Sequence, residues 1–125
     1  MKVENIKFKS KSILDGAWVQ GDLVHKEDGK IVILRNGFNV SEVDPSTVCQ
    51  YTGLADCEGN EIWEHDLLQS QKTKAIYEVV WDENGCFIIK DSAGGGYLLN
   101  FLGSILSVFK FKVVGNKFDR KEGEE

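Results

Sequence analysis

The stretch KAIYEVVWDENGCFIIK, residues 74–90, predicts a β-hairpin and decides the fold class. Residues 83–85, Glu-Asn-Gly, supply the turn, because an Asn-Gly pair tolerates the positive φ angles of a tight hairpin loop. Residues 86–90 then form the returning strand. On the first strand one parity is apolar, which indicates a strand buried mainly on one face. These apolar side chains are Ala75, Tyr77, Val79 and Trp81.

Other segments outside this hairpin carry the same kind of signal. Residues 17–35 predict a second hairpin, with Asp28-Gly29 in its turn. Short strands are expected at 48–51, 66–69 and 109–113, the last with Phe109, Phe111 and Val113 inward. The crowded apolar residues of 97–105 predict one short helix. Closely spaced strands with at most one short helix predict a mainly β protein, built as a small barrel or sandwich-like sheet.

A residue that ends secondary structure, Pro45, predicts that the chain has two parts. Pro45 follows Asp44 and ends the preceding element, since proline cannot donate to a strand ladder. We therefore expect an N-terminal β subdomain at 1–46, a C-terminal β subdomain at 47–115, and a charged flexible tail at 116–125.

Length, composition and charge narrow the classes of protein to which the chain can belong. A chain of 125 residues and 14.0 kDa is enough for one domain or for two small subdomains that share a core. Lys and Arg total 15 against 20 Asp and Glu, so the net charge of −5 disfavours a protein that neutralises phosphates. No apolar run approaches the roughly 18 residues of a membrane helix, and the N-terminus lacks the apolar core of a signal peptide. We expect a soluble cytoplasmic protein that makes no membrane contact.

A specific signature surrounds Pro45 and continues after it. It reads VDPSTVCQYTGL at 43–54, then Asp56, Gly59, EIWE at 61–64 and DLL at 66–68. This signature resembles the hallmark of the YopX family of small phage and prophage proteins. The resemblance extends to IKF at 6–8, GDLV at 21–24, YEVVW at 77–81 and VVGN at 113–116. Residues 50–66 are called the hallmark segment below, and its candidate binding residues are Gln50, Tyr51, Thr52, Gly53, Leu54, Asp56, Gly59, Ile62, Trp63 and Asp66.

The resemblance implies a two-part, mostly β structure with an SH3-like barrel in the second part, and self-association. It implies no established biochemical activity. The chain departs from the family at two positions, where family members commonly carry glycine and this chain has Cys49 and His65. If the glycine replaced by His65 serves a positive φ, then His65 must bear backbone strain.

The hallmark segment can also be explained without a ligand. Thr52 and Gly53 allow one tight turn, Asp56 and Gly59 allow another, and Ile62 and Trp63 anchor the loop in the core. A calcium site is disfavoured because the acidic residues are not in the register of an EF-hand loop. Cys49, Cys57 and Cys86 lack the spacing of a zinc site. No metal or cofactor is therefore expected.

Two alternative functions stay open beside a binding role. The basic N-terminal strand from Lys2 to Lys11 could bind nucleic acid, with Lys7, Lys9 and Lys11 around Phe8, although a half-buried strand would turn the phenylalanine inward. The other alternative is an enzyme acting on a small molecule at the acidic loop around His65. Glu64, His65 and Asp66 could form its acid–base set, but neighbours on an extended chain point to opposite faces.

The favoured hypothesis is a non-catalytic binding or assembly module. The hallmark signature is rich in glycine and aromatic residues, and no nucleophile with a base occurs in it. We expect a homo-oligomer, with a phage or host protein as a possible further partner and nucleic acid as a disfavoured one.

Overall fold

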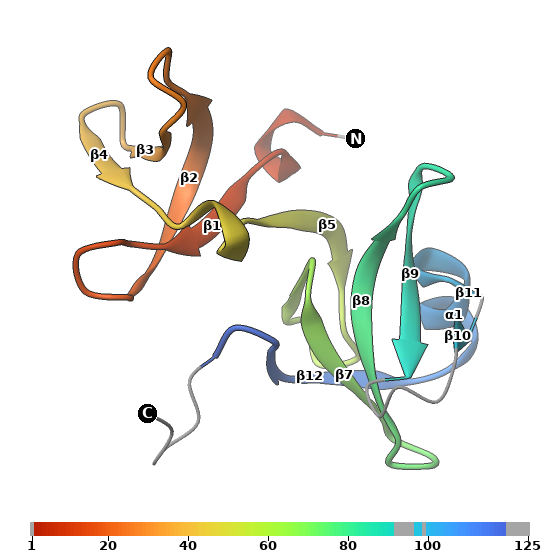
Figure 1. Cartoon of the computed structure of the whole chain (residues 1–125). Helices are drawn as coiled ribbons and strands as arrows, with labels where there is room; N and C mark the ends of the chain where they lie inside the picture. Colours follow the sequence, from red (N-terminus) through yellow and green to blue (C-terminus); the bar gives the residue numbers. More distant parts are fainter. Residues whose placement is uncertain (1, 92–96, 99, 120–125) are drawn as a thin grey trace. The chain divides into compact units, whose positions relative to one another are not determined.

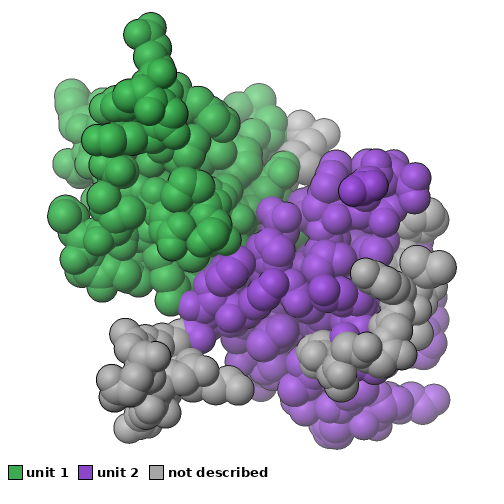
Figure 2. Space-filling view, viewed as in Figure 1, with its two compact units in different colours: residues 1–53 green, residues 54–125 purple. Residues whose placement is uncertain are grey.

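A computed structural model describes residues 2–91, 97–98 and 100–119 (Figure 1). The chain divides into two compact units, Met1–Gly53 and Leu54–Glu125 (Figure 2). The described strands form two antiparallel sheets, so the mainly β prediction is confirmed. No closed barrel occurs among the residues that the structure describes.

Unit 1 contains the hairpin predicted at residues 17–35 and one further hairpin. Its elements are η1 (Val3–Asn5), β1 (Phe8–Lys11), β2 (Trp18–His25), β3 (Ile31–Arg35), β4 (Asn39–Glu42), η2 (Pro45–Thr47) and the start of β5 (Cys49–Ala55). The strands pair in the order β4-β3-β2-β1-β5, and β5 also pairs with β6 (Glu61–Trp63). The predicted 17–35 hairpin is confirmed, with Gly29 at φ 87° in its turn. The further hairpin, formed by β3 and β4, turns at Asn36 and Gly37, which both have positive φ.

The core of unit 1 lies on one face of its sheet. Val19, Ile33 and Val43 are buried there, and Phe8 and Leu23 pack against them. Between β1 and η2, the buried Ser10 hydroxyl lies 2.8 Å from the Thr47 hydroxyl. Because both hydroxyls have partners, they can be buried at small cost.

Unit 2 carries the hairpin of residues 74–90. Its remaining elements are β6 (Glu61–Trp63), β7 (Asp66–Ser70), β8 (Ile76–Asp82), β9 (Cys86–Asp91), β10 (Tyr97–Leu98), β11 (Asn100–Phe101), α1 (Leu102–Val108) and β12 (Phe111–Asn116). The sheet order is β10-β9-β8-β7-β12, and β11 also pairs with β9. Both strands of the predicted hairpin and the strand at 66–69 are confirmed. The core consists of Ile62, Leu68, Val79, Ile89, Leu102, Ile105 and Phe111.

Three details of the second unit differ from the prediction. The helix begins at Leu102, because β10 and β11 pair with β9 where the apolar pattern predicted helix. Leu99 and the glycines at 94–96 lie outside the described residues. Trp81, at the end of the hairpin and beyond the core, is 51% exposed. Phe109 precedes β12 and is 46% exposed, so it is not part of the inward stripe.

The boundary between the units falls after Gly53, not after residue 46. Strand β5 is continuous from Cys49 to Ala55 and carries the chain from one unit into the next. Gly53 has φ 81° within this strand, so the tight turn expected at Thr52 and Gly53 is wrong. A glycine with positive φ inside a strand is typical of a local bulge, which bends the strand without reversing it.

Candidate functional site

Most of the ten candidate binding residues in the hallmark segment are buried. Gln50, Gly53 and Leu54 are partly exposed and Gly59 is exposed at its turn, whereas the other six candidate residues are buried. These six are Tyr51, Thr52, Asp56, Ile62, Trp63 and Asp66. Ile62 is fully buried in the core of unit 2, as the anchoring role predicted. Burial on this scale favours a structural role for the segment.

Asp56 organises the turn between β5 and β6. Its Oδ1 accepts the backbone N–H of Glu58 at 2.9 Å and of Asn60 at 2.8 Å. Gly59, at φ 84°, donates its N–H to the Asp56 carbonyl at 3.1 Å. The turn expected at Asp56 and Gly59 is therefore confirmed. A carboxylate that accepts several N–H donors in this way is a fixed structural group, because its lone pairs already have partners.

The same carboxylate reaches a strand that is distant in sequence. Asp56 Oδ2 accepts the backbone N–H of Val113 in β12 at 2.9 Å, and Cys57 donates its N–H to the Phe111 carbonyl at 3.1 Å. Because β12 ends its sheet, these bonds satisfy groups that the outer edge of the sheet would otherwise expose. The hallmark turn thus covers the edge of β12. No motif or spacing in the sequence indicates this contact.

The hydrogen bonds of Asp56 determine its ionisation. Burial opposes the charged form and is the largest single influence, but the N–H groups of Val113, Asn60 and Glu58, with the Asn60 amide, outweigh it and lower the pKa. Asp56 is therefore an anion in the folded protein at neutral pH. An acid of lowered pKa that is fully engaged in hydrogen bonds is poorly suited to proton transfer at neutral pH.

Asp66 forms a second buried junction. Its Oδ2 accepts the backbone N–H of Trp63 at 2.7 Å, and its Oδ1 accepts the side-chain amide of Asn116 at 2.9 Å. Asn116 is 5% exposed and ends β12. Sequence reasoning placed residue 116 in a flexible tail, whereas residues 116–119 are held here by such bonds. The VVGN resemblance was the signal that could have identified Asn116.

His65 adopts the backbone conformation that its departure from the family pattern predicted. Its φ is 70°, a left-handed value that is rare for residues with a Cβ. Nδ1 lies 2.9 Å from Glu78 Oε2, and Nε2 lies 3.6 Å from Glu64 Oε2. The Asp66 carboxylate instead bonds to Trp63 and Asn116. The three neighbours Glu64, His65 and Asp66 therefore do not converge on one point, and His65 lines none of the hollows described below.

A pair of substitutions at His65 separates strain from hydrogen bonding. His65→Gly and His65→Ala both remove the bond to the buried Glu78, but only glycine adopts φ 70° without strain. We expect the glycine variant to be more stable than the alanine variant by about 1–2 kcal/mol in urea denaturation. Equal stabilities of the two variants would show that the backbone at residue 65 carries no strain.

The other departure from the family pattern, Cys49, has a different explanation. Cys49 is fully buried, and its φ is not positive. Its Sγ lies 3.4 Å from the Thr47 carbonyl. The thiol therefore acts as a small packed side chain. All three cysteines are free thiols, and no group of three His, Cys, Asp or Glu residues in the described part of the chain is placed to hold a metal ion.

Lys9 and Lys11 of β1, and Lys7 just before it, lie on one side of the strand. Lys9 and Lys11 place their ammonium groups 4.7 and 5.4 Å from the ring centre of Trp18, and Lys7 lies 4.8 Å from that of Tyr51. Phe8 packs into the core on the opposite side, as predicted. Cation–π contacts occupy these ring faces, and Tyr51 is only 7% exposed, which leaves little ring surface for stacking bases.

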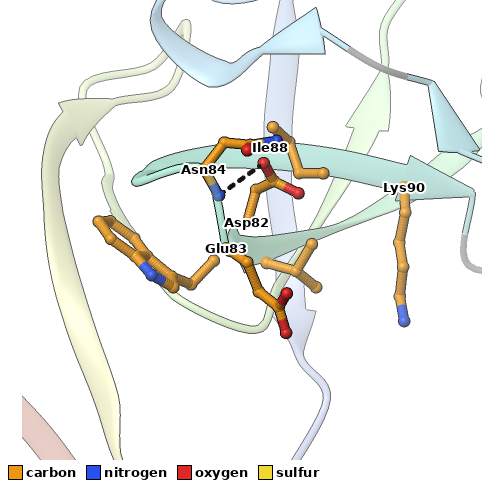
Figure 3. A pocket seen from close by; sticks show the side chains of 7 residues that line it. Asp82, Glu83, Asn84, Ile88 and Lys90 are labelled. Carbon is orange, nitrogen blue, oxygen red and sulfur yellow. Dashed lines mark hydrogen bonds between the residues drawn. The ribbon is translucent and has the colours of Figure 1, made fainter.

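A hollow of about 490 Å³ lies at the end of the β8–β9 hairpin (Figure 3). The Asp82 carboxylate accepts the Asn84 backbone N–H at 3.1 Å, and Lys90 lies further along β9. The hollow is lined by Val80, Trp81, Asp82, Glu83, Asn84, Ile88 and Lys90. This set contains no nucleophile with a base, so its chemistry is that of a contact surface.

The fold and the hallmark segment define a small antiparallel β protein of two units joined through a continuous strand. A family model described as YopX protein matches residues 2–122, and the chain belongs to the YopX family. No curated protein matches the chain. No helix among the described residues is both long and apolar enough to span a bilayer.

Proposed function

We propose that this chain is a non-catalytic binding and assembly module that self-associates. The carrying observation is an apolar surface on the sheet of unit 1, called the outer sheet face below. Leu34 lies directly opposite Val40, and Val24 directly opposite Val32, so all four share one face of the sheet, on which Val32 is buried and Val24 is 38% exposed. Val40 is 59% exposed, and Phe38 at the adjacent turn is 89% exposed.

A second copy of the chain is the proposed occupant of this face. Contiguous exposed apolar side chains on a soluble protein mark interaction sites, because their burial releases ordered water. The sheet edge beside them offers few free backbone groups for pairing, because the Glu42 carbonyl already accepts the N–H of Ile13. Face-to-face contact about a two-fold axis, in which the same patch meets itself, therefore suits the surface better than edge pairing.

Two more detailed proposals accompany this one. We propose that unit 2 is an SH3-like barrel whose closure runs through the bonds of the hallmark turn to β12, Asp56 to Val113 and Cys57 to Phe111. A phage or prophage origin, and a phage or host protein as a further partner, follow from the family resemblance. The two buried carboxylates of the hallmark segment, Asp56 and Asp66, accept hydrogen bonds from within the chain, which favours a structural role for that segment.

The test is the oligomeric state of matched variants. Light scattering after size exclusion should give the wild-type chain a mass above the 14.0 kDa monomer at high concentration. Val40→Lys should weaken association at least about tenfold, because a lysine ammonium would be desolvated in the contact. Leu14→Lys is the control, since Leu14 is 92% exposed in the same unit but lies outside the outer sheet face.

Two results would contradict the proposal. A wild-type chain that stays monomeric at high concentration would remove self-association altogether. Equal effects of Val40→Lys and Leu14→Lys would remove the outer sheet face as its surface.

A further inference from the structure

A groove in unit 2 combines exposed apolar side chains with positive charge. Two adjoining hollows, of about 220 and 430 Å³, share Lys72 and Phe109. They lie between the β7–β8 turn, the end of α1 and the start of β12. We call them the Phe109 groove.

Hydrogen bonds hold the walls of the groove together. Gln71 donates its N–H to the Lys110 carbonyl at 3.0 Å, and Phe109 donates its N–H to the Ile105 carbonyl at 2.9 Å. Ser70 lies opposite Phe111 in the β7–β12 ladder. Because these bonds tie all three wall elements, the groove is formed before any partner arrives, which lowers the cost of binding.

The smaller hollow is apolar and has the size of a side-chain pocket. Tyr77 and Phe111 meet edge to face there, with ring centres 5.9 Å apart, and Ile105 is buried beside them. The rim is apolar as well, since Phe109 is 46% and Val108 71% exposed. A cavity of about 220 Å³ with such a lining fits one aromatic or branched side chain.

The charge of the groove is opposite to that of the whole chain. Lys72 and Lys110 line it and no acidic residue does, although the chain carries a net charge of −5. No carboxylate of the described residues forms an ion pair with either ammonium. Two lysines beside an apolar pocket complement a ligand that carries carboxylates next to an apolar anchor.

We propose that the Phe109 groove binds an acidic peptide segment of a partner protein, with one aromatic or branched side chain in the small hollow and carboxylates against Lys72 and Lys110. The inference rests on the proposed binding role and adds the chemistry of the partner. A mainly apolar hollow of side-chain size favours a peptide over nucleic acid, because bases stack on open aromatic faces.

The probe is the synthetic peptide acetyl-Glu-Glu-Phe-Leu-Glu-Asp-amide, titrated into the nitrogen-15-labelled full chain. We expect saturable shifts of the amides of residues 70–73 and 105–111, with a dissociation constant of about 0.1 mM at low salt. Raising the salt concentration should weaken binding several-fold, because screening acts on the lysine–carboxylate attraction. Peptides with alanine in place of phenylalanine, or lysine in place of every acidic residue, should not bind.

Matched variants locate the contact. Lys72→Glu and Lys110→Glu should each weaken binding at least about tenfold. Lys26→Glu is the control, because Lys26 is exposed on the unit 1 hairpin and should leave binding within about twofold. Circular dichroism of each variant checks that the fold is kept.

Several outcomes would overturn the groove assignment. These are shifts confined to other residues, equal binding of the lysine peptide, and an oligo-dT strand that moves the same amides more strongly than the peptide. Self-association is scored separately, because the Val40→Lys variant should bind the peptide as the wild-type chain does. A wild-type chain that stays monomeric but binds the peptide would contradict only the assembly proposal, and a wild-type chain that associates but does not bind the peptide would contradict only the groove.

Discussion

Replacing Asp56 by alanine is expected to lower the free energy of unfolding by about 3 kcal/mol, because the turn and strand β12 lose their shared acceptor. The N–H groups of Glu58, Asn60 and Val113 all donate to this one carboxylate. All three bonds are partly buried, but Glu58 and Asn60 are exposed residues whose N–H groups can turn to water, whereas Val113 is only partly exposed. Urea denaturation followed by circular dichroism measures the loss.

Two control substitutions separate the contributions to this loss of stability. Asp56→Asn keeps one acceptor oxygen and should cost about half as much as alanine, because a neutral acceptor is weaker than a charged one. Glu58→Gln removes only the surface pair with Lys112, whose ammonium lies 3.5 Å from the Glu58 carboxylate, and should cost less than about 1 kcal/mol. An alanine variant as stable as the Glu58→Gln variant would show that the hallmark turn does not hold β12.

The same carboxylate predicts a dependence of stability on acid. The pKa of Asp56 is lowered in the folded chain from its ordinary value of 3.8. Its contribution is therefore complete above pH 3.8 and is lost as pH falls through the lower folded pKa, because the unfolded chain takes up the proton first. The difference in stability between the wild-type chain and Asp56→Asn should shrink below that pH. A difference that stays constant into strong acid would contradict the lowered pKa.

Local turn chemistry made much of the fold predictable. Asn84-Gly85 and Asp28-Gly29 fixed both predicted hairpins, because the glycine of each pair adopts a positive φ that few other residues tolerate. The helix was misplaced for an equally physical reason. Apolar residues crowded between 97 and 105 satisfy a helical pattern, but pairing of β10 and β11 with β9 competes for the same backbone groups.

The candidate site was harder to predict than the fold. The left-handed backbone of His65 followed from a family position that commonly carries glycine, because φ is a local property. The contacts of Asp56 with Val113 and of Asp66 with Asn116 join residues that are 57 and 50 positions apart. No periodicity or spacing in one sequence encodes such pairs, so the role of the hallmark turn at the edge of β12 required the structure.

Gly21→Ala is expected to be the most damaging single substitution among the glycines of unit 1. A Cβ at this position would lie 2.3 Å from the Leu34 carbonyl oxygen and 3.1 Å from a methyl group of Ile33. The first neighbour is backbone of β3 and cannot rotate away, so strands β2 and β3 must separate. We expect a loss of about 3 kcal/mol or more, at the upper end for overpacking.

Gly29→Ala is the matched control in the same hairpin. A glycine with positive φ is usually the more sensitive one to substitution, but here we expect Gly29→Ala to cost less than Gly21→Ala. Gly29 has φ 87° but open space around its Cα, so alanine there costs about 1 kcal/mol of left-handed strain. Gly21 has no positive φ, and its sensitivity comes from the close approach of β3 alone. Hydrogen exchange should therefore show lost protection in β1 to β4 for Gly21→Ala, and near-native protection for Gly29→Ala. The opposite order of stabilities would mean that β2 and β3 are not packed as closely as Leu34 and Gly21 require.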